Sequence, residues 1–491
     1  MNIFLINVKE RLINSEKYAI LFIFSIASLV RTVPELIAYP YPLGYDVINY
    51  YIPVVTNFDK YWPIISGQFP FYVSLLHVIN NSVGSLSLSP HFVVTAFAIL
   101  TYGIFAISIF FIGRKILKMN ITHSMYLTFF VIFQLTVLRT TWDLHRDLFS
   151  LSTMLLLFSI IYERKDINNR IVVIIASLIL AAITAISDRM VGLLCMLSLI
   201  IYTITDPKNR LTVLCSLVCT FFFVFSLIQG YGSLHNNTIE LLKSSQTVVP
   251  TSYNPTNLLI LFLVYNGMVT PLGIIGFKLW KNKLLKIPLL ITGLGAFSWI
   301  FFQELELLVA DRWIILFGIF LSIFAGYGII QLSAKKNTNF AKIIQRSFLS
   351  IIVAMGILYA VMPYDEYFVL YVIAGKYIQD FAPLSMQFNV LYIYDNDNLI
   401  DLVSWINNNT DPHSLIIGEK HWRGWMEIKL QDERDYIFSD DIYALYKNLV
   451  SEHTTSFYMI TKNGIKPPPS DTLKDIEMVY SDQIFNLFKI K

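Results

Sequence analysis

One aspartate lies among aromatic residues in the segment PYPLGYDVINYYIP, which covers residues 40–53. Asp46 follows Gly44 and Tyr45, shortly after the first long apolar run. A carboxylate there needs compensation, because apolar side chains and nearby lipid disfavour a charge. Partial burial raises the basicity of such a group, which suits a general base acting on a hydroxyl. The alternative is an Asx turn after Gly44, and we favour the general base.

Three tyrosines flank this carboxylate in the sequence. Tyr45 precedes Asp46 directly, and Tyr50 and Tyr51 follow it within the same segment. Their rings resemble a wall against which a sugar can stack. The segment therefore predicts a substrate site with Asp46 as its base.

A second polar group lies in TTWDLHRDLFS, residues 140–150. Asp143 and Asp147 are four apart, so on one helix they would project from the same face. Together with Asp46 they could hold a divalent cation, Mg²⁺ or Mn²⁺, and His145 could join them. Acids at a helix N-terminus also cap free N–H groups and offset the dipole. That purely structural role stays open for Asp143.

Three arginines are candidates for binding a phosphate, because a guanidinium matches phosphate geometry bidentately. They are Arg146, Arg189 and Arg312, and Arg312 begins the tenth apolar run. For Arg189, binding a site phosphate and reaching lipid headgroups are equally compatible with the sequence. Arg31, inside the first run, could extend outward or pair with a site carboxylate.

Composition indicates what must position these residues. Hydrophobic residues make up 55% of the 491 positions and charged residues 14%, which exceeds what soluble cores can bury. The runs approach the ~30 Å thickness of a bilayer core. We predict about eleven spans in a polytopic α-helical membrane protein. They cover residues 18–36, 91–112, 121–138, 148–162, 171–186, 190–204, 211–228, 259–277, 287–302, 313–332 and 348–362.

Charge orients these spans. The N-terminus and the alternate loops hold nineteen Lys and Arg residues, whereas the opposite loops hold six. Positive loops mark the cytoplasmic side. We therefore predict a multi-pass plasma-membrane protein with a cytoplasmic N-terminus and an extracytoplasmic C-terminal region. All the candidate site residues then lie at the outer ends of spans.

The last hundred residues follow a different pattern. Short helices alternate with short strands: helices over 399–407, 422–430 and 442–450, strands over 415–417, 436–438 and 457–461, and a closing hairpin near Ser481. Alternation of this kind predicts a small α/β domain. The expected division is a transmembrane catalytic domain (1–362), a linker (363–394) and an extracytoplasmic domain (395–491).

Several motifs resemble the GT-C superfamily of integral-membrane glycosyltransferases. They are GYD (44–46), RTTWDLHRD (139–147), DRWIILFGIFLSIFAGYGI (311–329) and WINNNTDPHSLIIGEKHWRGW (405–425). The last is similar to the region after the final span of oligosaccharyltransferase catalytic subunits. Its HWRGW lacks the acid and tyrosine of their signature, and Val47 replaces the second acid of protein O-mannosyltransferases. The resemblance therefore points to the superfamily and not to a subfamily.

The resemblance implies a polyprenyl- or dolichyl-phosphate-linked sugar as donor, and a glycan, lipid or protein as acceptor. Asp46 would be the catalytic base. Arg312, with Arg189 or Arg146, would bind the lipid phosphate, and a metal at Asp143 and Asp147 would assist. Membrane lipid is an expected partner and nucleic acid is not, because no basic stripe interleaved with aromatics is present.

Three other functions stay open. A transporter or flippase of an anionic lipid or solute would need charges near mid-membrane and broken helices. An oligosaccharyltransferase-like enzyme would transfer to asparagine. A non-enzymatic envelope scaffold would need no site at all.

The predicted topology can be tested by glycan mapping after expression in a eukaryotic host. Asn236 and Asn408 lie in Asn-x-Thr sequons predicted to be outside, and Asn120 in one predicted to be inside. We expect glycans on the first two, detected by mass spectrometry of the glycosidase-treated protein. A glycan on Asn120 would contradict the orientation.

Overall fold

The structure is a computed structural model of the full chain. It describes residues 15–65, 69–83, 89–163, 170–206, 209–245, 255–300, 310–336, 338–361, 393–419, 422–431, 434–439, 442–452, 457–464 and 476–490. Most of the expected linker therefore lies outside the described residues, as do Glu304 and Glu306 near the tenth run.

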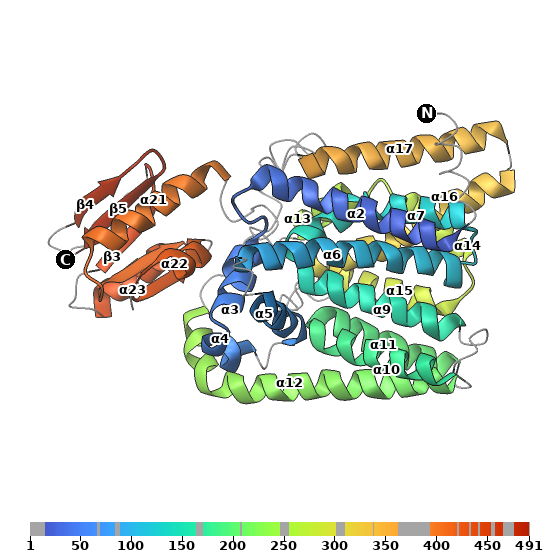
Figure 1. The fold of residues 1–491 in the computed structure, drawn as a ribbon, viewed down its shortest axis with the longest axis horizontal. Coiled ribbons are helices and arrows are strands. Elements are labelled where there is room, and N and C mark those ends of the chain that lie inside the picture. The colour runs from blue at the N-terminus through green and yellow to red at the C-terminus, as the bar shows by residue number, and fades with distance from the viewer. Residues whose placement is uncertain are drawn as a thin grey trace. The chain divides into compact units, whose positions relative to one another are not determined.

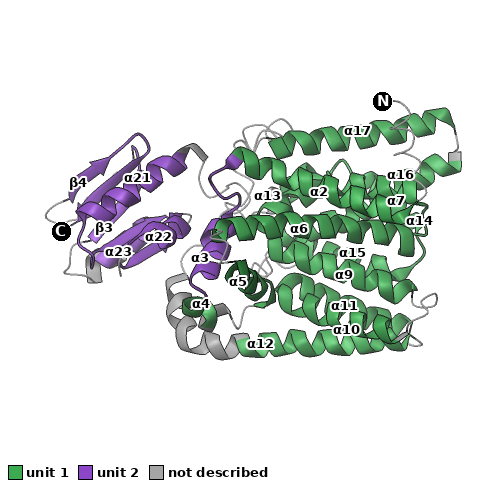
Figure 2. Ribbon diagram, in the orientation of Figure 1, with its two compact units in different colours: residues 1–37, 59–387 green, residues 38–58, 388–491 purple. Residues whose placement is uncertain are grey.

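The chain forms two compact units (Figures 1 and 2). Unit 1 comprises residues 1–37 and 59–387, and unit 2 comprises residues 38–58 and 388–491. The segment that carries Asp46 thus belongs to the same unit as the C-terminal residues. Sequence patterns did not suggest this association.

Unit 1 is a bundle of apolar helices (Figure 1). Where the structure describes them, the predicted spans coincide with helical segments; residues 301, 302 and 362 of two spans lie outside the described residues. The helices are α2 (Glu16–Ala38), α4 (Phe58–Ile65), α5 (Phe71–Val83), α6 (Pro90–Phe111), η3 (Ile112–Ile116), α7 (Ile121–Ile132), α8 (Leu135–Asp143), α9 (His145–Glu163), α10 (Arg170–Ser187), α11 (Arg189–Thr205), α12 (Arg210–Ser245), α13 (Pro255–Asn266), α14 (Thr270–Leu279), α15 (Lys283–Phe297), η6 (Ser298–Ile300), α16 (Ala310–Lys336) and α17 (Asn339–Val361).

Within the described residues, five helices are long and apolar enough to cross a membrane, or seven if each bent pair counts as one span. The protein is therefore a multi-pass membrane protein by composition and helix length. Helix α16 is the central span, because 94% of its apolar window is buried inside the protein. The larger count of eleven stays a prediction.

Two predicted spans are each broken into two helices. Helices α7 and α8 meet at 63°, and α13 and α14 meet at 73°. The two breaks supply each other's polar partners. The Gln134 side chain donates to the Tyr265 carbonyl over 3.1 Å, and the Thr136 hydroxyl donates to Asn266 over 3.0 Å. Such partners make irregular backbone tolerable inside a membrane protein.

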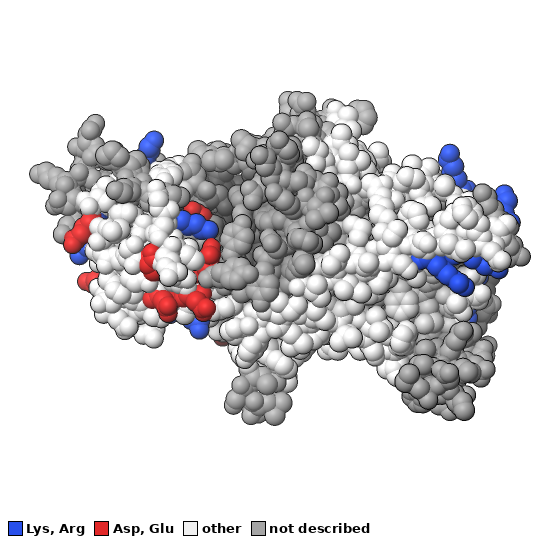
Figure 3. Space-filling view, turned by 90° about the horizontal axis from the view of Figure 1, so that it is seen from above, with Lys and Arg blue, Asp and Glu red and all other residues white. Residues whose placement is uncertain are grey.

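Basic side chains gather at one end of unit 1 (Figure 3). Exposed examples lie at or near the connections α14–α15 and α16–α17: Lys278, Lys281, Lys335, Lys342 and Arg346. Most of the remaining surface of this unit in Figure 3 carries no charge. The arrangement agrees with the charge asymmetry on which the predicted orientation rests.

The C-terminal part of unit 2 is the expected α/β layer structure. Five strands, β1 (Leu415–Glu419), β2 (Tyr436–Ser439), β3 (Phe457–Lys462), β4 (Ile476–Ser481) and β5 (Phe485–Ile490), form one sheet in the order β2-β1-β3-β5-β4. The first three are parallel, and Ile416 pairs with Tyr436 and Tyr458, whereas β5 and β4 are antiparallel. The helices are α21 (Ile393–Asn409), α22 (Arg423–Lys429) and α23 (Ile442–Glu452).

Candidate active site

The segment around Asp46 is compact and helical. Gly44 has φ of 109°, a conformation that side-chain-bearing residues rarely adopt, and it turns the chain into the helix. Asp46 is half-buried and directly precedes a π-helix, η1 (Val47–Tyr51), followed by α3 (Ile52–Thr56). The Asp46 side chain does not cap this helix. Single-turn π-helices are frequent at functional sites, where they redirect side chains.

The three tyrosines differ in exposure. Tyr45 and Tyr50 are half-buried, and Tyr51 is 1% exposed. The rings of Tyr50 and Tyr51 meet edge to face with centroids 5.4 Å apart. Tyr51 therefore supports Tyr50 from within the core of this unit, and the two half-buried rings are the ones available to a ligand.

The two aspartates of the second group lie on different helices. Helix α8 ends at Asp143, Leu144 interrupts the helix, and α9 begins at His145. Asp143 forms a 2.5 Å ion pair with Arg139, one turn earlier on α8. The expectation that Asp143 and Asp147 share one helix face is therefore wrong, because the backbone at Leu144 (φ −90°, ψ 53°) leaves the helical region.

Asp147 instead lies against a carboxylate from another helix. The Asp188 carboxylate lies close to its side chain, and Asp147 also interacts electrostatically with Arg312 and Arg146. Both aspartates are 2% exposed. Asp188 is also the N-cap of α11, because its Oδ1 accepts from the backbone N–H groups of Met190 and Val191 at 2.8 and 2.9 Å.

The remaining predicted residues surround this pair unequally. Arg146 and Arg312 are half-buried, and both act on Asp147. Arg189 is exposed, at the first position of α11. His145 is 1% exposed. The structure therefore brings together Asp147, Arg146 and Arg312 in unit 1, whereas Asp46 and the tyrosines belong to unit 2.

The donor atoms for a metal are fewer than predicted. Within the described ranges, no three His, Cys, Asp or Glu side chains converge as a metal site. Asp143 is already paired with Arg139. The Asp147–Asp188 pair offers oxygen ligands of the kind that Mg²⁺ uses, since this ion needs only one or two carboxylates when phosphate and water complete its shell. These two residues therefore fit a divalent cation in part.

Sequence reasoning missed two partners at this end of the bundle. Arg31 is 1% exposed and forms a 2.5 Å ion pair with Glu35, so it neither extends outward nor reaches a predicted site carboxylate. Its Nε also donates to the Thr141 carbonyl over 3.0 Å, which joins α2 to α8. The i,i+4 spacing of Arg31 and Glu35 was a usable signal. Asp188 lies far from Asp147 in the sequence, so spacing gave no signal for that pair.

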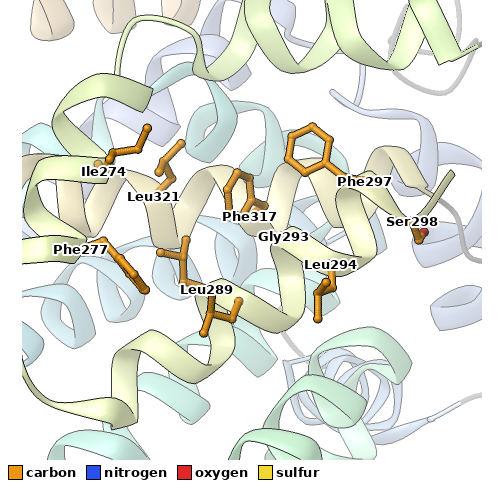
Figure 4. A pocket seen from close by; sticks show the side chains of 11 residues that line it. Ile274, Phe277, Leu289, Gly293, Leu294, Phe297, Ser298, Phe317 and Leu321 are labelled. Atoms are coloured by element: carbon orange, nitrogen blue, oxygen red, sulfur yellow. The ribbon is translucent and has the colours of Figure 1, made fainter. Parts of the chain in front are cut away.

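An apolar cavity of about 590 Å³ lies between α14, α15 and α16 (Figure 4). Side chains of Ile274, Phe277, Leu289, Phe317 and Leu321 surround it, and Ser298 is its one hydroxyl among the lining residues. Phe317 follows Arg312 by five residues on α16, which corresponds to roughly 7.5 Å along the helix. The cavity therefore begins below the arginine and continues toward the basic end.

The capping role of Asp188 can be separated from its charge. Asp188→Asn keeps an oxygen that accepts from Met190 and Val191, whereas Asp188→Ala removes it. We expect the alanine variant to be less stable by about 1 kcal/mol, and the asparagine variant to stay near wild type. Thermal unfolding in detergent measures both. Equal losses would show that the cap contributes nothing measurable.

No protein-family profile matches this sequence, and no characterised protein matches it by sequence. Solved structures do match. The crystal structure of ArnT from Cupriavidus metallidurans bound to undecaprenyl phosphate is similar over 97% of this chain and 98% of that one, at 11% identity and a TM-score of 0.52. AglB, the oligosaccharyltransferase of Archaeoglobus fulgidus, in complex with an inhibitory peptide and a dolichol-phosphate, matches over 91% and 70%, at 10% identity and a TM-score of 0.51. This chain has the GT-C fold of these membrane enzymes.

Proposed function

We propose that this protein is a membrane glycosyltransferase. It transfers a sugar from a polyprenyl- or dolichyl-phosphate-linked donor to an acceptor hydroxyl at the extracytoplasmic face. The observation that carries the proposal is the likeness to ArnT over nearly the whole chain, because that structure holds undecaprenyl phosphate. The carboxylates and arginines at the outer helix ends support it.

In the proposed reaction, Asp46 accepts the proton of the acceptor hydroxyl. The freed oxygen attacks the anomeric carbon, and the bond from that carbon to the phosphate oxygen breaks with inversion. The products are the glycosylated acceptor and the lipid phosphate, and the proton resides on Asp46 until solvent removes it. The half-buried position of Asp46 supports the assignment, because a base must remain within reach of the hydroxyl it deprotonates.

Arg312 and Arg146 are the proposed ligands of the departing phosphate. Both lie within electrostatic reach of Asp147, so the carboxyl pair can orient the guanidinium groups before the donor binds. Fixed cations facing the position where charge develops lower the barrier without reorganisation. Arg189 is a third candidate: its exposed position suits a headgroup contact at the rim.

A divalent cation, Mg²⁺ or Mn²⁺, is a proposed cofactor. Asp147 and Asp188 would hold it, with phosphate oxygens completing the shell. When bound, such an ion would neutralise charge on the leaving phosphate. Asp143 and His145 belong to the predicted set as well, although the ion pair of Asp143 with Arg139 makes Asp188 the better partner for Asp147.

The cavity of Figure 4 is the proposed site of the donor's isoprenoid tail. Its lining is almost entirely apolar, and the aromatic rings of Phe277, Phe297 and Phe317 offer flat faces to a branched chain. Arg312 lies on α16, the helix that also lines the cavity with Phe317 and Leu321. One donor could therefore place its phosphate at Arg312 and its isoprenoid tail in the cavity. Ordinary membrane acyl chains are the competing occupants.

Transport is the second candidate function, and the two bent helix pairs favour it. Discontinuous helices are where secondary transporters build their sites. However, the side chains that meet at these breaks, Gln134, Thr136 and Asn266, are uncharged. The charged residues lie instead at the ends of α8 and α9, which favours chemistry at one face. Transfer to asparagine remains a variant of the enzymatic proposal.

The role of Asp46 is tested by Asp46→Asn in purified protein supplied with polyprenyl-phosphate sugars. We expect transfer to fall by at least about 10²-fold, since a general base contributes about that much. Release of lipid phosphate measures turnover, and thermal unfolding checks that the variant folds. Asp59→Asn is the matched control, because Asp59 is an exposed carboxylate in the first turn of α4.

If Asp46→Asn turned over as fast as the wild-type protein, the assignment of Asp46 as the general base would be refuted. Donor that crosses a liposome membrane without being consumed would favour the transporter. Repeating the wild-type assay with EDTA, and then with added Mg²⁺ or Mn²⁺, tests the cofactor. Full activity in EDTA would exclude an ion that the reaction needs.

The tail site is tested by Gly293→Leu, which places a side chain in the cavity. A Cβ at Gly293 would already lie 3.0 Å from the Phe317 ring. We expect KM to rise about tenfold for a full-length donor and to change little for an analogue with two isoprene units. Ile175→Phe, at a half-exposed position on α10, controls for added apolar volume. Equal effects on both donors would assign the cavity to ordinary lipid.

A further inference from the structure

Helix α22 touches the Asp46 segment backbone to backbone. Gly424 lies so close to η1 that a Cβ on it would be 2.0 Å from the Ile48 carbonyl oxygen and 2.9 Å from the Asn49 Cα. Real side chains do not tolerate such distances, so only glycine fits at this position. Both partners belong to unit 2, although 375 residues separate Asn49 from Gly424.

A hydrogen bond fixes the register of this contact. The Gly424 N–H donates to Asn49 Oδ1 over 2.8 Å. The Nδ2 of the same asparagine donates to the Tyr45 carbonyl over 3.3 Å. Asn49 therefore links α22 to the residue directly before Asp46, and it does so with both ends of its amide.

A second contact lies at the entrance of the segment. The Tyr41 hydroxyl donates to the carboxylate of Asp397 on α21. The Tyr41 ring meets Trp425 edge to face, with centroids 6.0 Å apart and an interplanar angle of 78°. The segment is thus attached to two helices of the C-terminal domain, on both sides of Asp46 in the sequence.

Helix α22 is itself held firmly. Trp422, just before it, is fully buried and packs edge to face on Phe485 of β5. Tyr436 of β2 lies near Glu427, whose side chain is 2% exposed. Burial, together with the nearby Glu427 charge, raises the pKa of Tyr436 to about 12, so the phenol stays protonated. Gly424 is therefore presented by a rigid surface.

We propose that Gly424 and Asn49 are positioning residues for the Asp46 base. Their contact, through which the C-terminal domain holds the Asp46 segment in place, is called the clamp below. The proposal rests on the proposed glycosyl transfer for its kinetic part only. A short π-helix such as η1 is an uncommon and costly backbone conformation that persists where surrounding contacts hold it. The α22 contact supplies such a fixation directly at η1, within three residues of Asp46.

The clamp is tested by hydrogen exchange on the full chain in detergent, which needs no substrate. In Gly424→Ala, we expect amides of residues 45–52 to exchange about tenfold faster, because the added methyl group displaces η1. Gly464→Ala is the matched control. It makes the same chemical change in the same domain at a positive-φ turn, with nothing within 4 Å. It should leave the exchange of residues 45–52 unchanged.

Two replacements of Asn49 isolate the hydrogen bond. Asn49→Asp and Asn49→Leu have similar size, and both lose the amide donor to Tyr45, but only aspartate keeps an oxygen for the Gly424 N–H. We expect faster exchange of residues 45–52 in the leucine variant and near wild-type exchange in the aspartate variant. Identical exchange in the two would contradict the clamp.

Kinetics complete the test. Gly424→Ala should lower kcat about tenfold and leave the KM for the lipid donor within twofold, because the proposed donor ligands belong to unit 1. A rise in KM with unchanged kcat would overturn the positioning role. Faster exchange in Gly424→Ala, together with a wild-type protein that transfers no sugar, would support the clamp and refute the proposed function. Normal sugar transfer by Gly424→Ala with unaltered hydrogen exchange would refute the clamp and leave the proposed function supported.

Discussion

Charge neutralisation in apolar surroundings is the constraint on which unit 1 depends. Arg31, Arg139 and Asp147 are all nearly inaccessible to solvent, and each has an opposite charge within reach. Leaving one such charge uncompensated would cost about 3–5 kcal/mol, a large part of the stability of a folded protein. The partners come from different helices or successive turns, so satisfying them fixes how the helix ends are rotated. A cluster of charges at one end of the bundle is then a scaffold as well as a candidate site.

Much of the fold follows from the sequence because burial in lipid demands long apolar helices. The apolar runs gave most helix positions within a few residues, although α12 continues to Ser245 and α17 already begins at Asn339. The alternation after residue 395 gave the α/β order of the C-terminal domain. The breaks at Phe133 and Gly267 could not be found in this way, since one or two polar residues inside a long apolar run do not by themselves predict a bend. The stabilising partners, Gln134 with Tyr265 and Thr136 with Asn266, are more than a hundred residues apart.

The candidate site was predictable by residue type and less so by pairing. Asp147, Arg146 and Arg312 do come together, as one-sided charge suggested. Asp188 was the missing member, because its cap on α11 and its contact with Asp147 depend on how α9 and α11 pack. Asp143 shows the opposite case. Its spacing from Asp147 suggested that both lie on one helix face, but the helix is interrupted at Leu144, so they do not share a face. Spacing rules hold only while the helix continues.

The association of residues 38–58 with the C-terminal domain also orders events during synthesis. The Asp46 segment leaves the ribosome early, whereas Gly424, its backbone neighbour, follows 375 residues after Asn49. At translation rates of roughly 5–20 residues per second, the segment waits on the order of half a minute for its partner. During that interval the helices of unit 1 can insert while η1 still lacks its support. The segment that carries the candidate base therefore gains its final support only after helix α22 has been made.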